Sequence, residues 1–269
     1  MVFNPEKYTG IVISSVDVKD IRFPTSLEQH GSDAMHTDPD YSCAYVIIKC
    51  KGTDLEGHGL TFTIGKGTEI VCSACESLSR LITSISLETI VKDFRGFLRS
   101  LTCHSQLRWL GPEKGVIHLA TGAIINGIWD LLAKIEKLPL WKLLTEMTPE
   151  QLISICDFTY LTDAITEPEA LEILREAAKT KQMRENEMLK SGYPVYITSA
   201  GWLGYTDEEV RTRVGDALSK GFNKFKIKVG QSLESDVKRC NFIRELIGWE
   251  NTLMVDANQR WEVQVIGTT

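Results

Sequence analysis

The chain has 269 residues, of which 43% are hydrophobic and 25% charged, which is typical of a soluble globular protein and excludes a disordered or fibrous one. Its net charge of −6, from 30 Lys and Arg against 36 Asp and Glu, makes nucleic acid an unfavourable partner. No apolar run reaches the roughly 18–20 residues that span a bilayer, and the first twenty residues contain neither a secretory signal core nor an arginine. We therefore expect an intracellular, soluble protein without a visible mitochondrial presequence.

The first part of the chain is predicted to form an α+β domain, residues 1–150. Alternating apolar residues predict strands, which are expected at residues 10–23, 43–50 and 58–63. Apolar residues at helical spacing predict helices, which are expected at residues 69–82, 86–108 and, opened by Pro112, 113–137. A polar loop, residues 24–42, separates the first strand from the second, and we expect the helices to cover the small sheet.

The second domain is predicted to span residues 151–269, because strand and helix patterns alternate there. Strands are expected at residues 152–158 (LISICDF), 196–200, 225–229 and 253–257. Helices are expected between them, at residues 167–191, 206–220 and 233–247. This alternation is typical of βα units on a parallel sheet.

Three lysines recur at every second position of one predicted strand. Lys224, Lys226 and Lys228 share one face of it, and Phe225 and Ile227 lie on the other. A solvated edge strand is the simplest explanation. Strands between helices are normally buried on both faces, however, and inward-pointing ammonium groups there need anionic partners. This feature therefore favours a functional face.

The next predicted strand ends in an acidic and an amide residue that share a face, Asp256 and Asn258. Asp256 alone could equally be the cap of a following helix. A Lys-x-Lys strand followed one βα unit later by an Asp-x-Asn strand is more specific than either half. In a βα barrel, active sites lie at the carboxyl ends of the strands.

Several segments together resemble the mandelate racemase branch of the enolase superfamily. KIKVG (residues 226–230) and VDANQRW (residues 255–261) are similar to its second and third barrel strands, and residues 123–144 to the last helix of its capping domain. The loop from His30 to Ser42 and the segment SAGWLGY (residues 199–205) resemble the L-fuconate dehydratases within that branch. The resemblance implies an α+β capping domain followed by an incomplete (β/α)₈ TIM-type barrel with its first three strands only.

The resemblance also implies a reaction. A base removes the proton α to the carboxylate of a sugar acid, and the β-hydroxyl then leaves as water, giving a 2-keto-3-deoxy sugar acid in an Mg²⁺-dependent reaction. Lys228 matches the catalytic lysine of the family. Lys226 would touch the substrate carboxylate, and its charge would lower the pKa of Lys228. Asp256 matches the first magnesium ligand, as suits a cation that takes hard oxygen ligands.

The loop before the second strand is implied to bind the substrate. Gly31, Ser32, Asp33 and Tyr41 match positions that contact the sugar acid in the family. For Asp33 and Tyr41 alone, an Asx-turn and an anchoring aromatic are the alternatives. His30 and His36 lie in the same loop, and no role is predicted for them.

Two interpretations of the activity stay open. Thirteen residues follow Asp256, and the ending Val263–Thr269 does not continue the expected helix, whereas the family places two more metal carboxylates and a histidine on later strands. The chain is thus expected to be a dehydratase by family, or an inactive truncated isoform or fragment that acts through protein interaction. Homo-oligomers, pairing with a full-length subunit, and a mitochondrial or cytoplasmic location also stay open.

Overall fold

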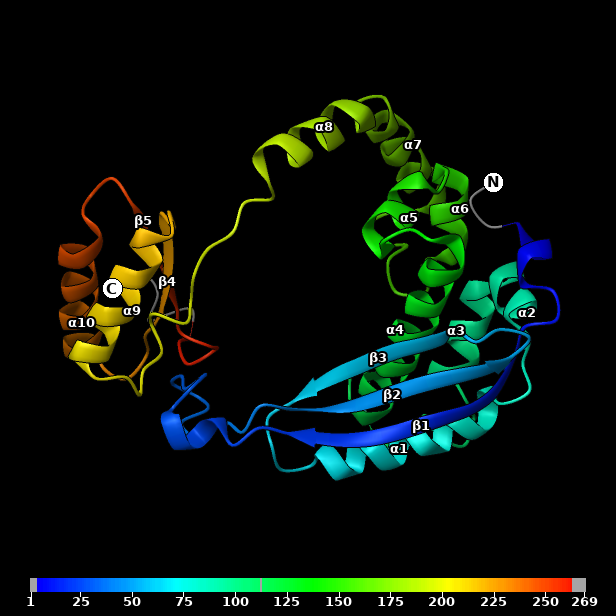
Figure 1. The fold of residues 1–269 in the computed structure, drawn as a ribbon, viewed down its shortest axis with the longest axis horizontal. Helices are drawn as coiled ribbons and strands as arrows, with labels where there is room; N and C mark the ends of the chain where they lie inside the picture. The colour runs from blue at the N-terminus through cyan, green and yellow to red at the C-terminus, as the bar shows by residue number, and fades with distance from the viewer. Residues whose placement is uncertain (1–3, 112, 263–269) are drawn as a thin grey trace. The chain divides into compact units, whose positions relative to one another are not determined.

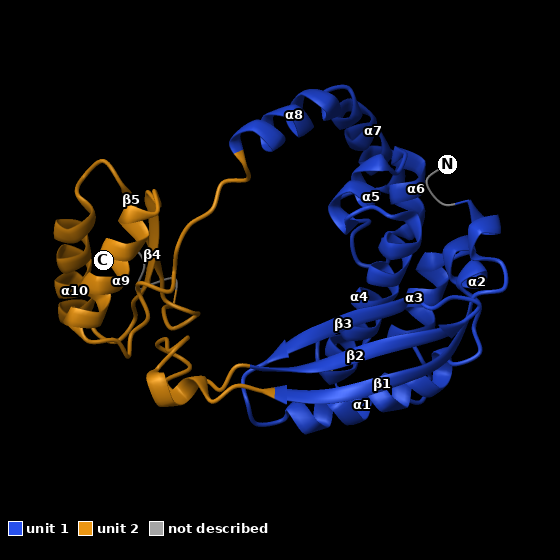
Figure 2. Ribbon diagram, viewed as in Figure 1, with its two compact units in different colours: residues 1–21, 42–191 blue, residues 22–41, 192–269 orange. Residues whose placement is uncertain are grey.

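A computed structural model describes residues 4–111 and 113–262 (Figure 1). The predicted helix start at Pro112 and the predicted irregular ending, residues 263–269, lie outside the described residues. The chain divides into two compact units (Figure 2). Unit 1 consists of Met1–Ile21 and Ser42–Ser191, and unit 2 of Arg22–Tyr41 and Gly192–Thr269.

Unit 1 contains a three-stranded sheet in the order β1-β2-β3. The strands are β1 (Val12–Arg22), β2 (Ser42–Lys51) and β3 (Glu56–Thr63). β2 and β3 pair antiparallel, as the two predicted strands and the glycines between them require. Ala44, Val46 and Ile48 alternate along β2 and are fully buried, so one face of the sheet forms the floor of the core.

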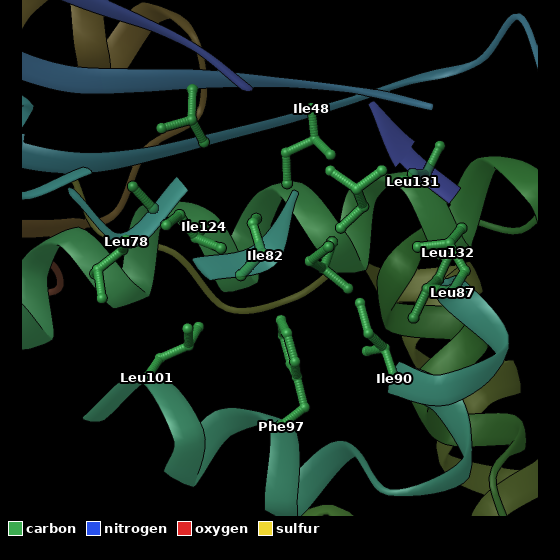
Figure 3. Close-up of a cluster of buried hydrophobic side chains, with 14 of the residues drawn as sticks. Ile48, Leu78, Ile82, Leu87, Ile90, Phe97, Leu101, Ile124, Leu131 and Leu132 are labelled. Carbon is green, nitrogen blue, oxygen red and sulfur yellow. The ribbon is translucent and has the colours of Figure 1, made fainter. Parts of the chain in front are cut away.

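Helices supply the rest of unit 1. They are α1 (Thr68–Ile82), α2 (Leu87–Lys92), α3 (Phe94–Thr102), α4 (Val116–Glu136), α5 (Leu140–Glu146), α6 (Pro149–Ile155), α7 (Glu167–Ala178) and α8 (Lys181–Ser191), with a short 3-10 turn, η1 (Pro5–Tyr8), before β1. α1 and α4 pack against β2 and β3, and Figure 3 shows Ile48, Ile82 and Ile124 in the core that results. Apolar residues at helical spacing therefore cover the sheet, as predicted.

Helix α4 is the central element of this core. It is long and apolar enough to cross a membrane by length and composition alone, although polar residues interrupt its apolar sequence. Ile124, Ile128 and Leu131 on it are fully buried, and most of the helix lies inside the unit. Its apolar surface is thus used in packing.

Close approach between α4 and β3 depends on glycine. A Cβ atom at Gly59 would lie 2.0 Å from the carbonyl oxygen of Ala123, and one at Gly57 would lie 2.2 Å from that of Gly127. The obstacles are backbone atoms, which cannot rotate away. β3 can therefore lie against α4 only without side chains at these two positions.

Unit 2 contains a parallel pair of strands flanked by helices. β4 (Lys224–Lys228) pairs with β5 (Thr252–Asp256), and α9 (Asp207–Ser219) and α10 (Leu233–Ile247) connect and flank them. Phe225, Ile227 and Val229 lie in its core with residues of both helices. The first part of the unit is the loop of residues 22–41, which contains a short 3-10 turn, η2 (Thr25–Glu28).

Four predicted elements differ from the structure. The single helix predicted at 86–108 is two helices, α2 and α3, separated at Asp93 and ending at Thr102. Residues 152–158 were predicted as a strand, but Pro149–Ile155 form α6, because Thr148 and Gln151 make a reciprocal capping box and Pro149 occupies the first turn. The single helix predicted at 167–191 is two helices, α7 and α8. Of residues 196–200, only Ile197 pairs with β4, through a bridge to Phe225.

The compact units do not coincide with the predicted division at residue 150. The loop 22–41 belongs to unit 2, and α6, α7 and α8 belong to unit 1. The loop leaves the sheet of unit 1 after β1, returns to it at β2, and makes its hydrogen bonds to residues 203 and 204 of unit 2. A single boundary in the sequence cannot assign residues 22–41 to unit 2 while the strands on both sides of them belong to unit 1.

We expect Gly59→Ala to lower the free energy of unfolding by about 1–3 kcal/mol, the usual cost of forcing extra atoms into a packed core. Urea unfolding followed by circular dichroism measures it. Gly122→Ala on α4, the helix that Gly59 approaches, is the control, because a Cβ there meets nothing within 4 Å. Alanine is about 1 kcal/mol better than glycine in a helix, so this variant should not be destabilised. Equal losses in both variants would contradict the close-approach argument.

Candidate active site

The lysine strand places its charged side chains as the sequence predicts. On β4, Phe225 and Ile227 are each 1% exposed and face the core of unit 2. Lys226 and Lys228 lie on the opposite face, and Lys228 is buried to 9% exposure. A buried ammonium group needs anionic or carbonyl partners, because burial without them disfavours the charge.

Those partners come from the end of β5. Lys228 pairs with Asp256 in the strand register, and its Nζ donates to Asp256 Oδ2 at 2.9 Å and to Asn258 Oδ1 at 2.7 Å. Lys226 Nζ lies 3.2 Å from the same Asp256 oxygen. We call these four residues the lysine cluster. The carboxyl ends of two parallel strands thus bring together the groups that the sequence spacing singled out.

A local turn holds the carboxylate in place. The backbone N–H of Asn258 donates to Asp256 Oδ1 at 3.0 Å, and Asn258 adopts a left-handed conformation with φ of 48°. Asparagine tolerates that region better than most residues. Both oxygens of Asp256 are therefore engaged by groups of the cluster and its own turn.

The surroundings of Asp256 and Lys226 favour the ionised form of each. Burial raises the pKa of Asp256, but hydrogen bonds from Lys228, from the Asn258 N–H and from Lys226 outweigh it and lower the pKa to about 2. The pKa of Lys226 is raised, chiefly by its hydrogen bond to Tyr196, against the effect of burial and with help from Asp256. Two ammonium groups and one carboxylate leave a net charge of +1, which attracts an anion.

Tyr196 is a member of the site that the sequence analysis missed. Lys226 Nζ donates to the hydroxyl of Tyr196 at 2.9 Å and lies 4.6 Å from the centre of its ring. The contact combines a hydrogen bond with a cation–π interaction. The available signal was the position of Tyr196 beside Ile197, which pairs with the lysine strand.

The structure places the predicted substrate loop in the same unit. Gly31 has φ of +78°, and a Cβ there would lie 2.2 Å from the hydroxyl oxygen of Tyr41, so only glycine fits. Ser32 is 2% exposed, and its hydroxyl donates to the carbonyl of Gln29 and accepts from the N–H of Gly204, both at 2.8 Å. Ser32 is thus bonded to the loop itself and to residues beyond α8.

Asp33 has an Asx-turn geometry, one of the two alternatives that its sequence context left open. Its Oδ1 accepts from the N–H groups of Met35 and His36 at 2.8 and 2.7 Å, and the His36 ring lies 3.2 Å from both carboxylate oxygens. The next residue, Ala34, packs against Gly230, where a Cβ would lie 3.1 Å from Ala34 Cβ. The loop therefore lies against the segment that follows Lys228 by two residues.

The donor chemistry at the end of β5 fits part of a magnesium site. Asp256 and Asn258 offer the carboxylate and amide oxygens that Mg²⁺ takes. Among residues 4–111 and 113–262, no group of three or more His, Cys, Asp or Glu side chains could hold a metal ion. Within that part of the chain, Asp256 is the carboxylate at this site, and it is bonded to two lysines.

Comparison with known proteins identifies the family. Residues 209–265 match the model of the enolase C-terminal domain-like family. Mitochondrial enolase superfamily member 1 of Xenopus laevis is 57% identical over 253 residues, which cover 94% of this chain and 57% of that protein. The crystal structure of the human protein of the same name, 54% identical, superposes with a TM-score of 0.91 over 94% of this chain and 58% of that one. The chain belongs to the enolase superfamily.

Other members of the superfamily are sugar-acid dehydratases. L-galactonate dehydratase of Hypocrea jecorina is 46% identical over 256 residues, which cover 94% of this chain and 57% of that protein. L-talarate/galactarate dehydratase of Salmonella typhimurium LT2, liganded with Mg and L-lyxarohydroxamate, has a TM-score of 0.67 at 21% identity over 96% of this chain and 54% of that one, and supports the fold. The predicted capping domain with part of a barrel is confirmed, and the chain spans a little over half the length of these relatives.

We expect Lys228→Gln to raise the pKa of Asp256 toward its ordinary value near 3.8, because Lys228 is the strongest of the groups that lower it. The carboxyl ¹³C shift of Asp256, followed against pH, measures this. With a folded pKa below the ordinary one, ionised Asp256 stabilises the fold fully above about pH 4 and loses this effect as the pH falls through about 2. An unchanged titration in the variant would show that Lys228 is not the partner.

Proposed function

We propose that this chain carries the proton-abstracting part of a sugar-acid dehydratase of the enolase superfamily, with L-fuconate as the first substrate to test. The observation that carries the proposal is the buried Lys228, bonded to Asp256 and Asn258 beside Lys226. The relative named L-galactonate dehydratase supports a sugar acid as the substrate class.

The chemistry follows from what the cluster binds. The ammonium group of Lys226, with the net positive charge of the cluster, would hold the substrate carboxylate by charge-assisted hydrogen bonds. Lys228 in its neutral form would then accept the α-proton at Nζ, as a lysine base does in enolase-type sites. The electrons left at the α-carbon form the carbon–carbon double bond as the β-hydroxyl departs as water with a proton taken from solvent. The resulting enol gains a proton at C3 and loses the proton of its C2 hydroxyl to solvent, which gives the 2-keto-3-deoxy acid.

Magnesium is the proposed cofactor, since the Salmonella dehydratase structure is liganded with Mg. Asp256 would hold it as one ligand, and Asn258 offers a neighbouring amide oxygen. When bound, Mg²⁺ stabilises negative charge on the carboxylate oxygens of the substrate, which makes a weak carbon acid easier to deprotonate.

The loop residues are proposed to select the substrate. Gly31, Ser32, Asp33 and Tyr41 lie in one loop of unit 2, whose neighbour Ala34 packs against Gly230. Polyol hydroxyls need donors and acceptors of this kind. A mitochondrial location is proposed on the name of the frog and human relatives, while oligomer formation stays a prediction.

We expect Lys228→Ala to reduce exchange of the α-hydrogen of L-fuconate with deuterated solvent by about 10²–10⁴-fold, the usual contribution of a general base. Because the chain spans 57% of the frog relative, the assay uses the chain itself and a chimera in which residues 1–262 continue into the remainder of that relative. Proton NMR measures the exchange, and 2-keto acid formation measures turnover, each with Mg²⁺ and with EDTA.

Lys224→Ala is the matched control, since Lys224 lies on the same strand and its side chain bonds only to its neighbour Asn223 among the described hydrogen bonds. It should retain exchange. A chimera without exchange or turnover on L-fuconate, L-galactonate or L-talarate would reject the proposal. That outcome would favour the alternative of a chain that acts through protein interaction.

A further inference from the structure

Four aromatic rings of unit 2 join the substrate loop to the segment between α8 and α9. His30 and Tyr41 come from the loop, and Trp202 and Tyr205 from the segment; we call them the aromatic clamp. The ring of Trp202 lies 5.5 Å from that of His30, 5.5 Å from that of Tyr205 and 6.5 Å from that of Tyr41. Tilted and edge-on aromatic contacts at these distances are favourable.

One hydrogen bond in the clamp joins the side chains of His30 and Tyr205. The Tyr205 hydroxyl lies 2.7 Å from His30 Nδ1, and Glu28 Oε2 lies 2.7 Å from His30 Nε2. Both ring nitrogens of His30 are thus engaged, one on each side of the ring. His30 is therefore held as a structural link, and neither nitrogen is free to act on a substrate.

Backbone contacts continue the link toward the substrate-binding positions. The N–H groups of Leu203 and Gly204 donate to the carbonyl and hydroxyl oxygens of Ser32, at 3.2 and 2.8 Å. A Cβ at Gly204 would lie 2.5 Å from Gln29 Cβ, so the backbone of Gly204 lies directly against the side chain of Gln29. Ser32 follows His30 by two residues, and whatever fixes His30 also fixes Ser32.

The segment that receives the loop is itself anchored by both helices. Arg239 on α10 donates through Nη2 to the carbonyl oxygen of Trp202 at 2.7 Å. Arg213 on α9 lies 4.5 Å above the ring of Tyr205 and is bonded to Glu209 at 2.9 Å. The aromatic clamp therefore holds the loop against a segment that contacts from both α9 and α10 fix in place. The loop itself contains only the short turn η2.

We propose that His30 and Tyr205 are positioning residues for the sugar-acid site. They hold residues 31–33 in place within unit 2, so that the loop lies against the segment following Lys228. The ligand class in this inference rests on the proposed function. The holding of the loop rests only on the contacts of the aromatic clamp.

The first experiment measures amide hydrogen exchange in the 269-residue chain with His30→Leu, Tyr205→Phe and both together. The amides of Ser32 and Asp33 are hydrogen-bonded to Gln29 and His36 and report on the loop. Each single variant should speed their exchange about three- to tenfold, as expected for the loss of one partly buried hydrogen bond. The double variant should add little, because both changes remove the same bond.

Internal controls separate a local from a global effect. The amide of Val229, bonded to the carbonyl of Asp256, should keep its protection in all variants. Tyr193→Phe changes a tyrosine of the same unit that is 73% exposed, and it should leave exchange unchanged. His30→Asn, whose amide oxygen can take the place of Nδ1 as acceptor, should restore protection. Unchanged exchange in the single variants, or additive effects in the double variant, would overturn the proposal.

The second experiment separates positioning from general support of the fold. Calorimetry measures the affinity of the same variants for L-fuconate and for acetate, which is small enough to meet only the lysines. Positioning predicts weaker binding of L-fuconate by the same factor as the exchange and unchanged binding of acetate. If the variants lose affinity equally for both acids, or lose affinity for neither acid, the clamp only supports the fold and the proposal is rejected. If the parent chain binds acetate but no sugar acid, the proposed substrate is wrong, and the exchange experiment still decides the clamp.

Discussion

One carboxylate shared by two ammonium groups organises the candidate active site of this protein. Asp256 lies at the end of β5, and its Oδ2 is the common partner of Lys226 and Lys228 on β4. The buried ammonium group of Lys228 is tolerated because its partners are in place, so the strand register, the Asn258 turn and the lysine positions depend on one another. The pairing of β4 with β5 therefore serves two purposes. It brings the lysines to their carboxylate partner, and it buries the apolar face of β4.

The sequence was informative where one physical rule decides the outcome. Alternation along β4 sends Lys226 and Lys228 to the same face, and the βα spacing brings Asp256 and Asn258 to the same edge, so the lysine cluster could be predicted without coordinates. Apolar periodicity likewise predicted the covered sheet of unit 1. Residues 152–158 show the limit of such rules, since an apolar run is compatible with strand or helix and the capping box at Thr148 decided between them.

Contacts between distant segments were out of reach of pattern reasoning. Nothing in the order of residues indicates that His30 meets Tyr205, which lies 175 positions later, or that Lys226 meets the ring of Tyr196. These contacts arise when loops pack on the core, and loop sequences have no regular spacing of apolar residues that would predict their partners. The same reason explains why the loop 22–41 was assigned to the first domain from its position and lies in unit 2 in the structure.

The excursion of that loop has a consequence for biosynthesis. Ser32 and the residue that bonds it, Gly204, are 172 positions apart, so the loop leaves the ribosome long before its docking surface exists. At translation rates of about 5–20 residues per second, the delay is roughly 10–30 seconds. Throughout that interval unit 1 can form its sheet around a loop that has nowhere to bind. Until residues 202–205 have been made, the loop lacks its partners, and its aromatic and histidine side chains are accessible to chaperones and proteases.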